Sequence, residues 1–361
     1  MANNSKISRS HLFYQTDQRR PRVARAEGIY LWDQDGKRYI DASSGPMVSN
    51  IGHGNRRVLA AMKQQMDQTT FAYRLHFEND PAEELAALTA SLMPEDLDRV
   101  FFVSGGSEAI ESCLKLARQY AISQGETKRW KVISLYPSYH GSTLGATAVT
   151  GMDPFVEPFA DMIQVMPKIP AATCYLDQDQ LSDQQRGLGY AEKLREEIIQ
   201  QDPETVLAFL FEPVGGASTG ALVPPDSWFQ RIEEICQEFG VLMIADEVMT
   251  GAGRTGAFLA CNHWNLCPDI IALAKGFAAG YAPLGAMVAK RHVVDSVIDH
   301  RGFAHGYTYA GNPLSCAAGL AVLKEVLEND LTQQAATQGG KLKKCLDPLA
   351  MRYPFIGHVR G

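Results

Sequence analysis

Residues 245–280 read ADEVMTGAGRTGAFLACNHWNLCPDIIALAKGFAAG and place two ionisable side chains beside apolar runs. Asp246 ends the apolar run 241–245, and Lys275 lies inside a second run. A buried lysine is costly to keep charged and tends towards a neutral, nucleophilic amine, whereas a buried acid that stays ionised needs a cationic partner. This pair of residues suits an aldehyde cofactor with a basic ring nitrogen.

The chain around this stretch alternates apolar runs with helical patterns. Runs typical of strands covered on both faces lie at residues 206–211, 241–245, 268–273 and 284–289, with helices predicted over 190–201 and 226–239. This alternation predicts an α/β fold, with a mostly parallel sheet and helices on both faces.

Polar or chemically active side chains follow several of the predicted strands. They are Ser104 to Ser107, Tyr139, Glu212, Asp246 and Lys275. Ligands of such sheets bind beyond the carboxyl ends of the strands, so these residues are expected to share one site.

A strand at 99–103 runs into Ser104-Gly105-Gly106-Ser107 and a helix over 108–123. Free N–H groups and the helix dipole could bind a phosphate there. The alternative is structural, because Ser107 is also a good helix N-cap. Glu108 and Glu111 would oppose an anion if they pointed inward.

Two further loops have a functional and a structural interpretation. Tyr139, after a strand at 131–136, either stacks on a planar ligand or packs within its loop, and His140 is expected to be a hydrogen-bonded structural histidine. Residues 43–55, rich in Gly, Ser and Asn, either line a site or only connect elements.

The remaining segments give a coarse outline of the chain. We predict a hairpin over 28–41 around Asp35-Gly36, outside the main fold, and helices over 56–68, 81–93 and 314–328. Residues 154–189 are predicted to form a long loop with short helical pieces, and 340–361 to begin another element.

Composition excludes several classes of protein. The 361 residues are 45% hydrophobic with a net charge of −7, which argues against a dominant nucleic-acid surface. Arg19, Arg20, Arg22 and Arg25 are read as a solvated arm. No stretch is long enough to span a membrane, and no apolar leader is present, so we expect a cytoplasmic protein. The seven cysteines are expected to be reduced, and we predict no metal site.

Taken together, the motifs resemble those of the class III aminotransferases, which are pyridoxal-phosphate enzymes of fold type I. The resemblance spans about residues 22–361 and rests on SGGSEAIESCLKLAR, YHGSTLGA, FEPVGGASTG, ADEVMTGAGRTGAF, PDIIALAKGFAAGYAPLGAM and HGYTYAGNP, in the family's order. It implies a small-domain segment at 1–55, a large cofactor-binding domain at 56–313, and a connecting helix with the start of a C-terminal small domain at 314–361.

The resemblance also implies roles for individual residues. Lys275 is similar to the family's Schiff-base lysine, Asp246 to the partner of the pyridinium nitrogen, and Val248 to the apolar contact on the ring. Gly106 and Ser107 are similar to the phosphate turn. Thr308 occupies the place of a threonine that reaches the neighbouring subunit's phosphate, which implies a homodimer. The full set of expected cofactor contacts is Gly106, Ser107, Tyr139, Glu212, Asp246, Val248, Lys275 and Thr308, and the expected substrate contacts are Met47, Tyr139 and Ala217.

The implied reaction is ping-pong transfer of an amino group from an amine or omega-amino acid to a small keto acid such as pyruvate. HGYTYAGNP and GPMVSN resemble the omega-amino-acid and amine:pyruvate type. The alternatives are an aminomutase or racemase on the same scaffold, or a non-catalytic cofactor-binding protein. The chain ends before the part that commonly supplies a carboxylate-binding arginine. Either it is truncated or the acceptor is bound in another way, and Glu212 is left without an evident partner.

Overall fold

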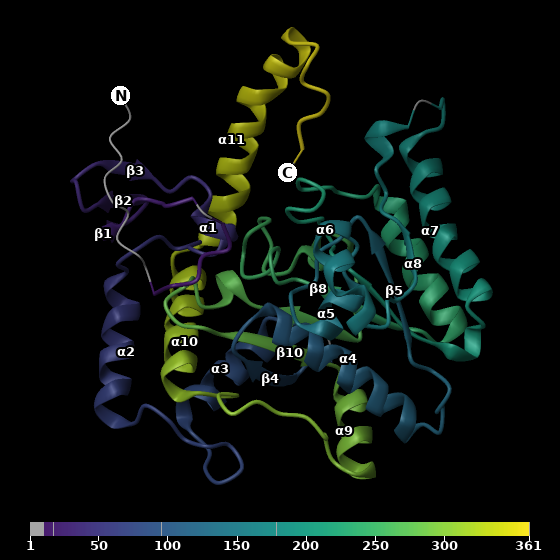
Figure 1. Cartoon of the computed structure of the whole chain (residues 1–361), viewed down its shortest axis with the longest axis horizontal. Helices are drawn as coiled ribbons and strands as arrows, with labels where there is room; N and C mark the ends of the chain where they lie inside the picture. The colour runs from purple at the N-terminus through teal and green to yellow at the C-terminus, as the bar shows by residue number, and fades with distance from the viewer. Residues whose placement is uncertain (1–10, 17, 95, 178, 361) are drawn as a thin grey trace.

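A seven-stranded sheet organises the protein, whose computed structural model describes residues 11–16, 18–94, 96–177 and 179–360 (Figure 1). The strand order is β4-β10-β9-β8-β7-β5-β6. Strand β10 is antiparallel to β4 and β9, and the other pairs are parallel, so the prediction of a mostly parallel sheet is confirmed. The strands are β4 (Arg99–Val103), β5 (Lys131–Tyr136), β6 (Lys168–Pro170), β7 (Val206–Phe211), β8 (Leu242–Asp246), β9 (Ile270–Leu273) and β10 (Gly285–Ala289).

Helices cover both faces of this sheet, and the side chains of β7 show how. Phe209 and Phe211 belong to one buried cluster and Leu210 to the other, as the two-residue period of a strand requires. The first cluster includes residues of α3 (Asp80–Ser91), α7 (Asp183–Gln200), α8 (Asp226–Phe239) and α10 (Pro313–Glu328). The second includes residues of α4 (Gly106–Ser123), α5 (Leu144–Val149) and α9 (Arg291–His300).

A separate three-stranded antiparallel sheet precedes these elements. Strands β2 (Tyr30–Asp33) and β3 (Arg38–Ile40) form the predicted hairpin, with Gly36 at φ +80°, where glycine is favoured. Strand β1 (Val23–Glu27) was not predicted. The arginine cluster is exposed, as predicted, but Arg25 belongs to β1 and its guanidinium lies 3.5 Å from the Trp32 ring centroid.

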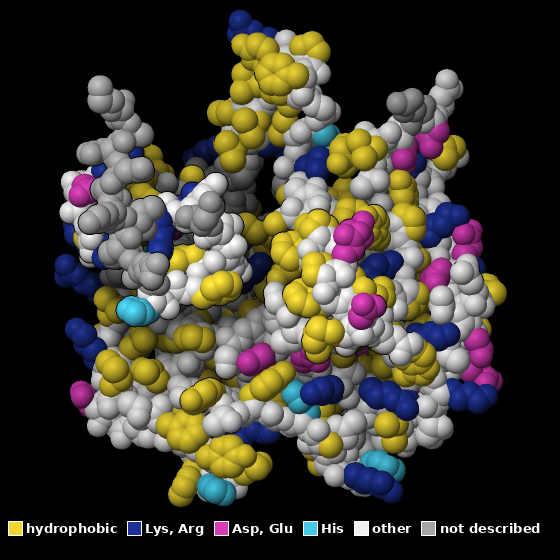
Figure 2. All heavy atoms as spheres, in the orientation of Figure 1, with side chains coloured by type: hydrophobic (Ala, Val, Ile, Leu, Met, Phe, Trp, Pro, Cys, Tyr) yellow, Lys and Arg dark blue, Asp and Glu magenta, His cyan; other side chains and the backbone are white. Residues whose placement is uncertain are grey.

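The C-terminal helices complete the molecule. Helix α10 packs against α2 (Arg56–Gln68) and α3, and α11 (Leu331–Arg352) rises from it at the top of Figure 1. Figure 2 shows hydrophobic side chains gathered on the protruding end of α11, where Met351 is 85% exposed and Phe355, just beyond the helix, is 83% exposed. Such a gathering is typical of a contact surface. The predicted domain limits at residues 55 and 313 stay a prediction.

Several predicted limits were wrong. Helix α7 begins at Asp183, because Ser182 and Gln185 form a capping box, and not at residue 190. Gly187 concealed it from the pattern, yet a Cβ there would lie 2.3 Å from Ser227 Oγ, so the glycine lets α7 approach α8. The short elements β6, α5 and α9 were missed, and α11 begins at Leu331 instead of residue 340. Residues 43–55 contain a short irregular helix, α1 (Ser44–Met47).

No described helix is long and apolar enough to cross a bilayer. No group of three or more His, Cys, Asp or Glu side chains in the described part of the chain could hold a metal ion.

Candidate active site

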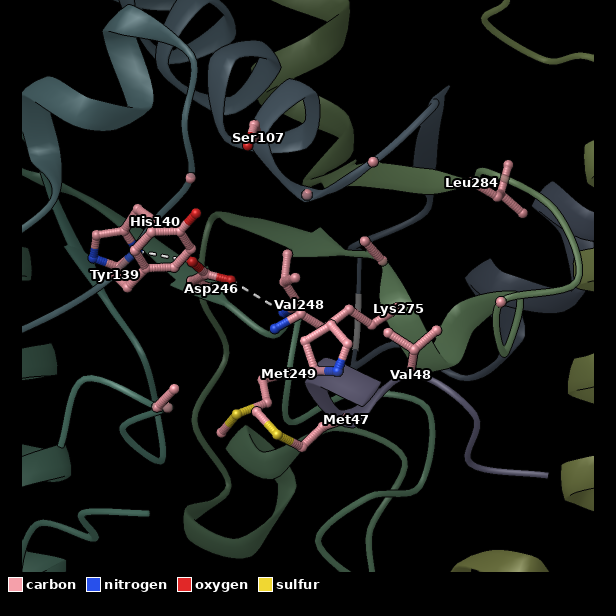
Figure 3. Close-up of a pocket in the computed structure, with 18 of the residues that line it drawn as sticks. Met47, Val48, Ser107, Tyr139, His140, Asp246, Val248, Met249, Lys275 and Leu284 are labelled. Carbon is pink, nitrogen blue, oxygen red and sulfur yellow. Dashed lines mark hydrogen bonds and ion pairs between the residues drawn. The ribbon is translucent and has the colours of Figure 1, made fainter. Parts of the chain in front are cut away.

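A cavity of about 590 Å³ gathers the predicted site residues beyond the carboxyl ends of the strands (Figure 3). It is lined by Pro46, Met47, Val48, Ser104 to Ser107, Tyr139, His140, Gly141, Glu212, Gly216, Ala217, Asp246, Val248, Met249, Ala274, Lys275, Gly280 and Ala282 to Leu284. The structure thus places every predicted cofactor and substrate contact in this cavity except Thr308. Thr308 lies in an exposed turn and does not line the cavity.

Asp246, the last residue of β8, is 6% exposed and accepts two hydrogen bonds. Its Oδ1 accepts from the backbone N–H of Val248 at 3.0 Å, and its Oδ2 lies 2.8 Å from His140 Nδ1. Because a carboxylate only accepts, Nδ1 of His140 carries the proton. The other ring nitrogen, Nε2, is buried and has no hydrogen-bond partner among the described residues. The structural histidine expected from the sequence therefore orients the acid of the site.

Lys275 lies two residues beyond the end of β9 and adopts φ +47°, a left-handed conformation that is uncommon for a non-glycine residue. Burial lowers the pKa of its amine, the carboxylates of Asp246 and Glu212 oppose that effect, and the charge of Arg254 adds to it. The net direction is downward, so a larger fraction of the amine is neutral at a given pH than for an exposed lysine.

The turn between β4 and α4 differs in one detail from the prediction. Gly105, not Ser107, is the N-cap of α4, and the Ser107 hydroxyl accepts a hydrogen bond from the Ser142 N–H at 3.0 Å. A Cβ on Gly106 would lie 2.9 Å from Val248 Cγ1, so glycine is needed for this close approach. The backbone N–H groups of the first helical turn have no intrahelical acceptor and border the cavity.

The two acids of this turn are held by neighbouring backbone. Glu108 accepts from the Ser104 N–H at 2.7 Å, and Glu111 accepts from the Gly145 N–H at 2.8 Å. Both carboxylates thereby fix the shape of the site.

Glu212 accepts hydrogen bonds from backbone N–H groups rather than from an arginine side chain. It is 8% exposed and accepts from the N–H groups of Tyr139 at 3.2 Å and Gly216 at 2.9 Å. Burial raises the pKa of its carboxyl group. The Tyr139 hydroxyl lies 2.9 Å from Ser142 Oγ, which together with the Glu212 contact fixes the ring at the cavity wall.

Two residues near the site escaped sequence reasoning. Glu247 is fully buried and accepts from the N–H groups of Ala260 at 3.0 Å and Cys261 at 2.8 Å, and from the Thr250 hydroxyl. It anchors the loop that follows β8. Arg254 lines a neighbouring cavity. The sequence signal for Glu247 was its place directly after a buried strand, but the pattern could not show which donors face it.

The arrangement offers the contacts that an aldehyde cofactor with a phosphate and a basic aromatic ring requires. The turn at Gly105 to Ser107 offers N–H groups to a phosphate, and Tyr139 and Val248 offer an aromatic and an apolar surface to a ring. Asp246 offers a carboxylate to a ring nitrogen, and Lys275 offers an amine to the aldehyde. These residues fit pyridoxal 5′-phosphate.

Comparison with known proteins gives the class. The family model described as Aminotransferase class-III matches residues 14–361, so the chain belongs to the class-III aminotransferases, enzymes that depend on pyridoxal phosphate.

Particular relatives are similar over nearly the whole chain. The uncharacterized aminotransferase YodT of Bacillus subtilis is 42% identical over 343 residues, which cover 94% of this chain and 77% of YodT. The putrescine–pyruvate aminotransferase of Pseudomonas aeruginosa is 33% identical over 342 residues, covering 94% of this chain and 74% of that enzyme. A solved amine transaminase from an uncultivated Pseudomonas species, in its PLP-bound form, has a TM-score of 0.92 at 36% identity and covers 100% of this chain and 83% of that one.

Proposed function

We propose that this aminotransferase moves an amino group from an amine or omega-amino acid to a small keto acid such as pyruvate, by a ping-pong mechanism. The observation that carries the proposal is the convergence of Lys275, the Asp246–His140 pair and a helix N-terminus on one cavity. The names of the similar proteins, which include a putrescine–pyruvate aminotransferase and an amine transaminase, support the choice of an amine donor.

Several residues bind and orient the cofactor in this proposal. Gly106 and Ser107 bind its phosphate, and Tyr139 and Val248 enclose its ring. Glu212 holds the Tyr139 loop through the Tyr139 N–H, which stabilises that enclosure. Pyridoxal phosphate, when bound, supplies an aldehyde that condenses with amines and a ring that withdraws electrons from the substrate Cα.

Two residues handle protons. Asp246 keeps a proton on the ring nitrogen through its ionised carboxylate, which His140 orients from the other side. Lys275 Nζ, the amine that would lie beside the cofactor's aldehyde, would act as the base that takes the proton from the substrate Cα and as the acid that gives it back. The lowered pKa of Lys275 suits the first step, because only the neutral amine accepts a proton.

The wall formed by Met47, Tyr139 and Ala217 is proposed to contact the substrate. Thr308, which does not line its own subunit's cavity, is proposed to reach the phosphate site of a second copy, so that a homodimer shares its sites. Its exposure supports this arrangement.

A half-reaction tests the proposal. The holoenzyme is mixed with putrescine or butylamine without an acceptor, and the cofactor absorbance and carbonyl product are followed. The proposal predicts one carbonyl per active site and conversion of the cofactor to its amine form, reversed by pyruvate. An isomer formed without any acceptor would instead indicate a mutase or racemase, and no reaction with any amine would refute the proposed donor class.

A further inference from the structure

A second cavity, of about 720 Å³, adjoins the lysine pocket. The two cavities share Met47, Gly216, Ala217 and Met249 as walls, whereas the Gly105 to Ser107 turn lines only the first. Figure 3 shows Met47 and Met249 near one another, on the opposite side of the pocket from Ser107. The second cavity therefore extends the pocket away from the proposed phosphate site, in the direction available to a substrate.

Arg254 is the cation of this second cavity. Its Nη2 donates to the Met47 carbonyl at 3.3 Å. No carboxylate oxygen of the described residues lies within 4.0 Å of its nitrogen atoms, so the guanidinium has no ion-pair partner among them. A guanidinium has five N–H donors, so most of this group's hydrogen-bonding capacity is left for another acceptor. Partial burial lowers its pKa, but an arginine remains protonated.

The charge of Arg254 is also close enough to Lys275 to act on its amine. Arg254 lowers the pKa of Lys275, although the two residues line different cavities. One molecule that spans the shared wall could therefore place a reacting carbon at Lys275 and an anionic group at Arg254.

The backbone of Arg254 is held in place. Gly253 and Gly256 both have φ +89°, and a Cβ on either would lie 2.8 Å from an atom of α11, on Thr332 and Ala336 respectively. The carbonyl of the preceding Ala252 accepts from Asn50 Nδ2 at 3.3 Å. The fixed backbone limits the region that the guanidinium can reach, and its hydrogen bond to the Met47 carbonyl restricts it further, so less entropy is lost on binding an anion.

The other polar groups of this cavity have partners. Asp226 accepts from Trp264 Nε1 at 2.8 Å, and His263 Nε2 lies 3.1 Å from both oxygens of Thr255. The remaining walls include Val214, Ala221 and Val223. A mainly apolar cavity whose guanidinium has no ion-pair partner among the described residues is suited to an organic acid whose apolar part packs against the walls.

We propose that Arg254 binds the carboxylate of the keto-acid acceptor, and of amino-acid substrates, while their reacting carbon lies at Lys275. This assignment rests on the proposed function and specifies its substrate class. Arginine binds a carboxylate through two parallel N–H donors, so recognition at this position separates acids from uncharged amines and aldehydes. Binding of an acid also places a negative charge beside a guanidinium that has no ion-pair partner among the described residues.

The test compares acids with uncharged substrates in the same variant. Holoenzyme Arg254→Gln is followed by cofactor absorbance in single-turnover half-reactions with butylamine as donor and with pyruvate or butanal as acceptor. We expect the pyruvate concentration for half-maximal rate to rise about 100-fold, which is roughly 2.8 kcal/mol at 1.4 kcal/mol per tenfold. The butylamine and butanal concentrations for half-maximal rate should change less than about threefold. Arg254→Lys should recover part of the pyruvate affinity.

A second substitution in the same cavity serves as the control. Val223→Ala, which alters the same cavity without removing charge, should leave the ratio of pyruvate to butanal unchanged. If Arg254→Gln weakens pyruvate and butanal equally, or leaves pyruvate unaffected, Arg254 is not the carboxylate site. If the parent enzyme itself shows no half-reaction with butylamine or putrescine, the proposed donor class fails instead, so the two failures are distinguishable.

Discussion

Replacing Asp246 with Asn removes a charge from the site while preserving its shape. The carboxylate accepts from the Val248 N–H at 3.0 Å and from His140 Nδ1 at 2.8 Å. The amide introduced by Asp246→Asn can keep the first bond with its oxygen, but it presents N–H groups to His140. The imidazole must then move its proton to Nε2, which has no acceptor among the described residues.

The size of the effect follows from these contacts. The rearranged hydrogen bond is expected to lower stability by about 1–3 kcal/mol. Loss of a buried ionic partner for the ring nitrogen is expected to cost about 3–5 kcal/mol in the transition state. At 1.36 kcal/mol per tenfold, this is a decrease in rate of about 10² to 10⁴-fold. Cofactor binding should persist, because the phosphate turn and Lys275 are unchanged.

The assay is the amine half-reaction, with the rate divided by the measured content of bound cofactor. Asp269→Asn is the matched control. Its carboxylate accepts from the Met243 N–H at 2.8 Å and from Lys290 Nζ at 3.0 Å, at the opposite end of the same strands. That variant should lose stability but keep its rate per bound cofactor. A rate for Asp246→Asn within about fivefold of the parent would refute the role assigned to this acid.

Three further predictions concern the surroundings of the site. Gly106→Ala places a Cβ 2.9 Å from Val248 Cγ1 and should lower the free energy of unfolding by about 1–3 kcal/mol. Gly105→Ala, whose Cβ would meet open space, should leave that free energy unchanged. Chemical denaturation measures both variants, and equal effects would contradict the packing argument. Glu247→Ala leaves three buried donors without an acceptor and should lower the free energy of unfolding by at least about 3 kcal/mol. The exposed Glu328→Ala should change that free energy negligibly. An unchanged free energy of unfolding for Glu247→Ala would disprove its anchoring role. The rate at which apoenzyme captures added pyridoxal phosphate should rise with pH through a Lys275 pKa below that of free lysine, because only the neutral amine reacts. Arg254→Gln should move this rise to higher pH, since the charge of Arg254 lowers the pKa of Lys275. A rise that moves to lower pH or stays in place would contradict the proximity of the two charges.

The sequence predicted the centre of the fold well because burial on both faces leaves a strong signal. Strands β4, β5 and β7 and helix α2 begin and end at the predicted residues, since each is a periodic or continuously apolar run. The grouping of Tyr139, Asp246 and Lys275 followed from the rule that ligands bind beyond the carboxyl ends of parallel strands.

The features that the sequence missed depend on contacts between distant residues. Strand β6 has only three residues and lies at the edge of the sheet, so it carries no period of its own. The backbone donors of Glu212 come from two different loops. Arg254 could not be placed beside a second cavity, because its walls come from segments that are far apart in the sequence, such as Met47 and Val223.

Exchange of the Cα hydrogen of a donor amine with solvent tests whether Lys275 moves this proton in a pyridoxal-phosphate site built on Asp246. Holoenzyme is incubated with butylamine deuterated at Cα, and washout of deuterium is followed in the parent and in Lys275→Ala, at equal bound cofactor. We expect washout in the parent and a decrease of about 10³-fold in the variant. Equal washout in both proteins would show that a group other than Lys275 moves the proton.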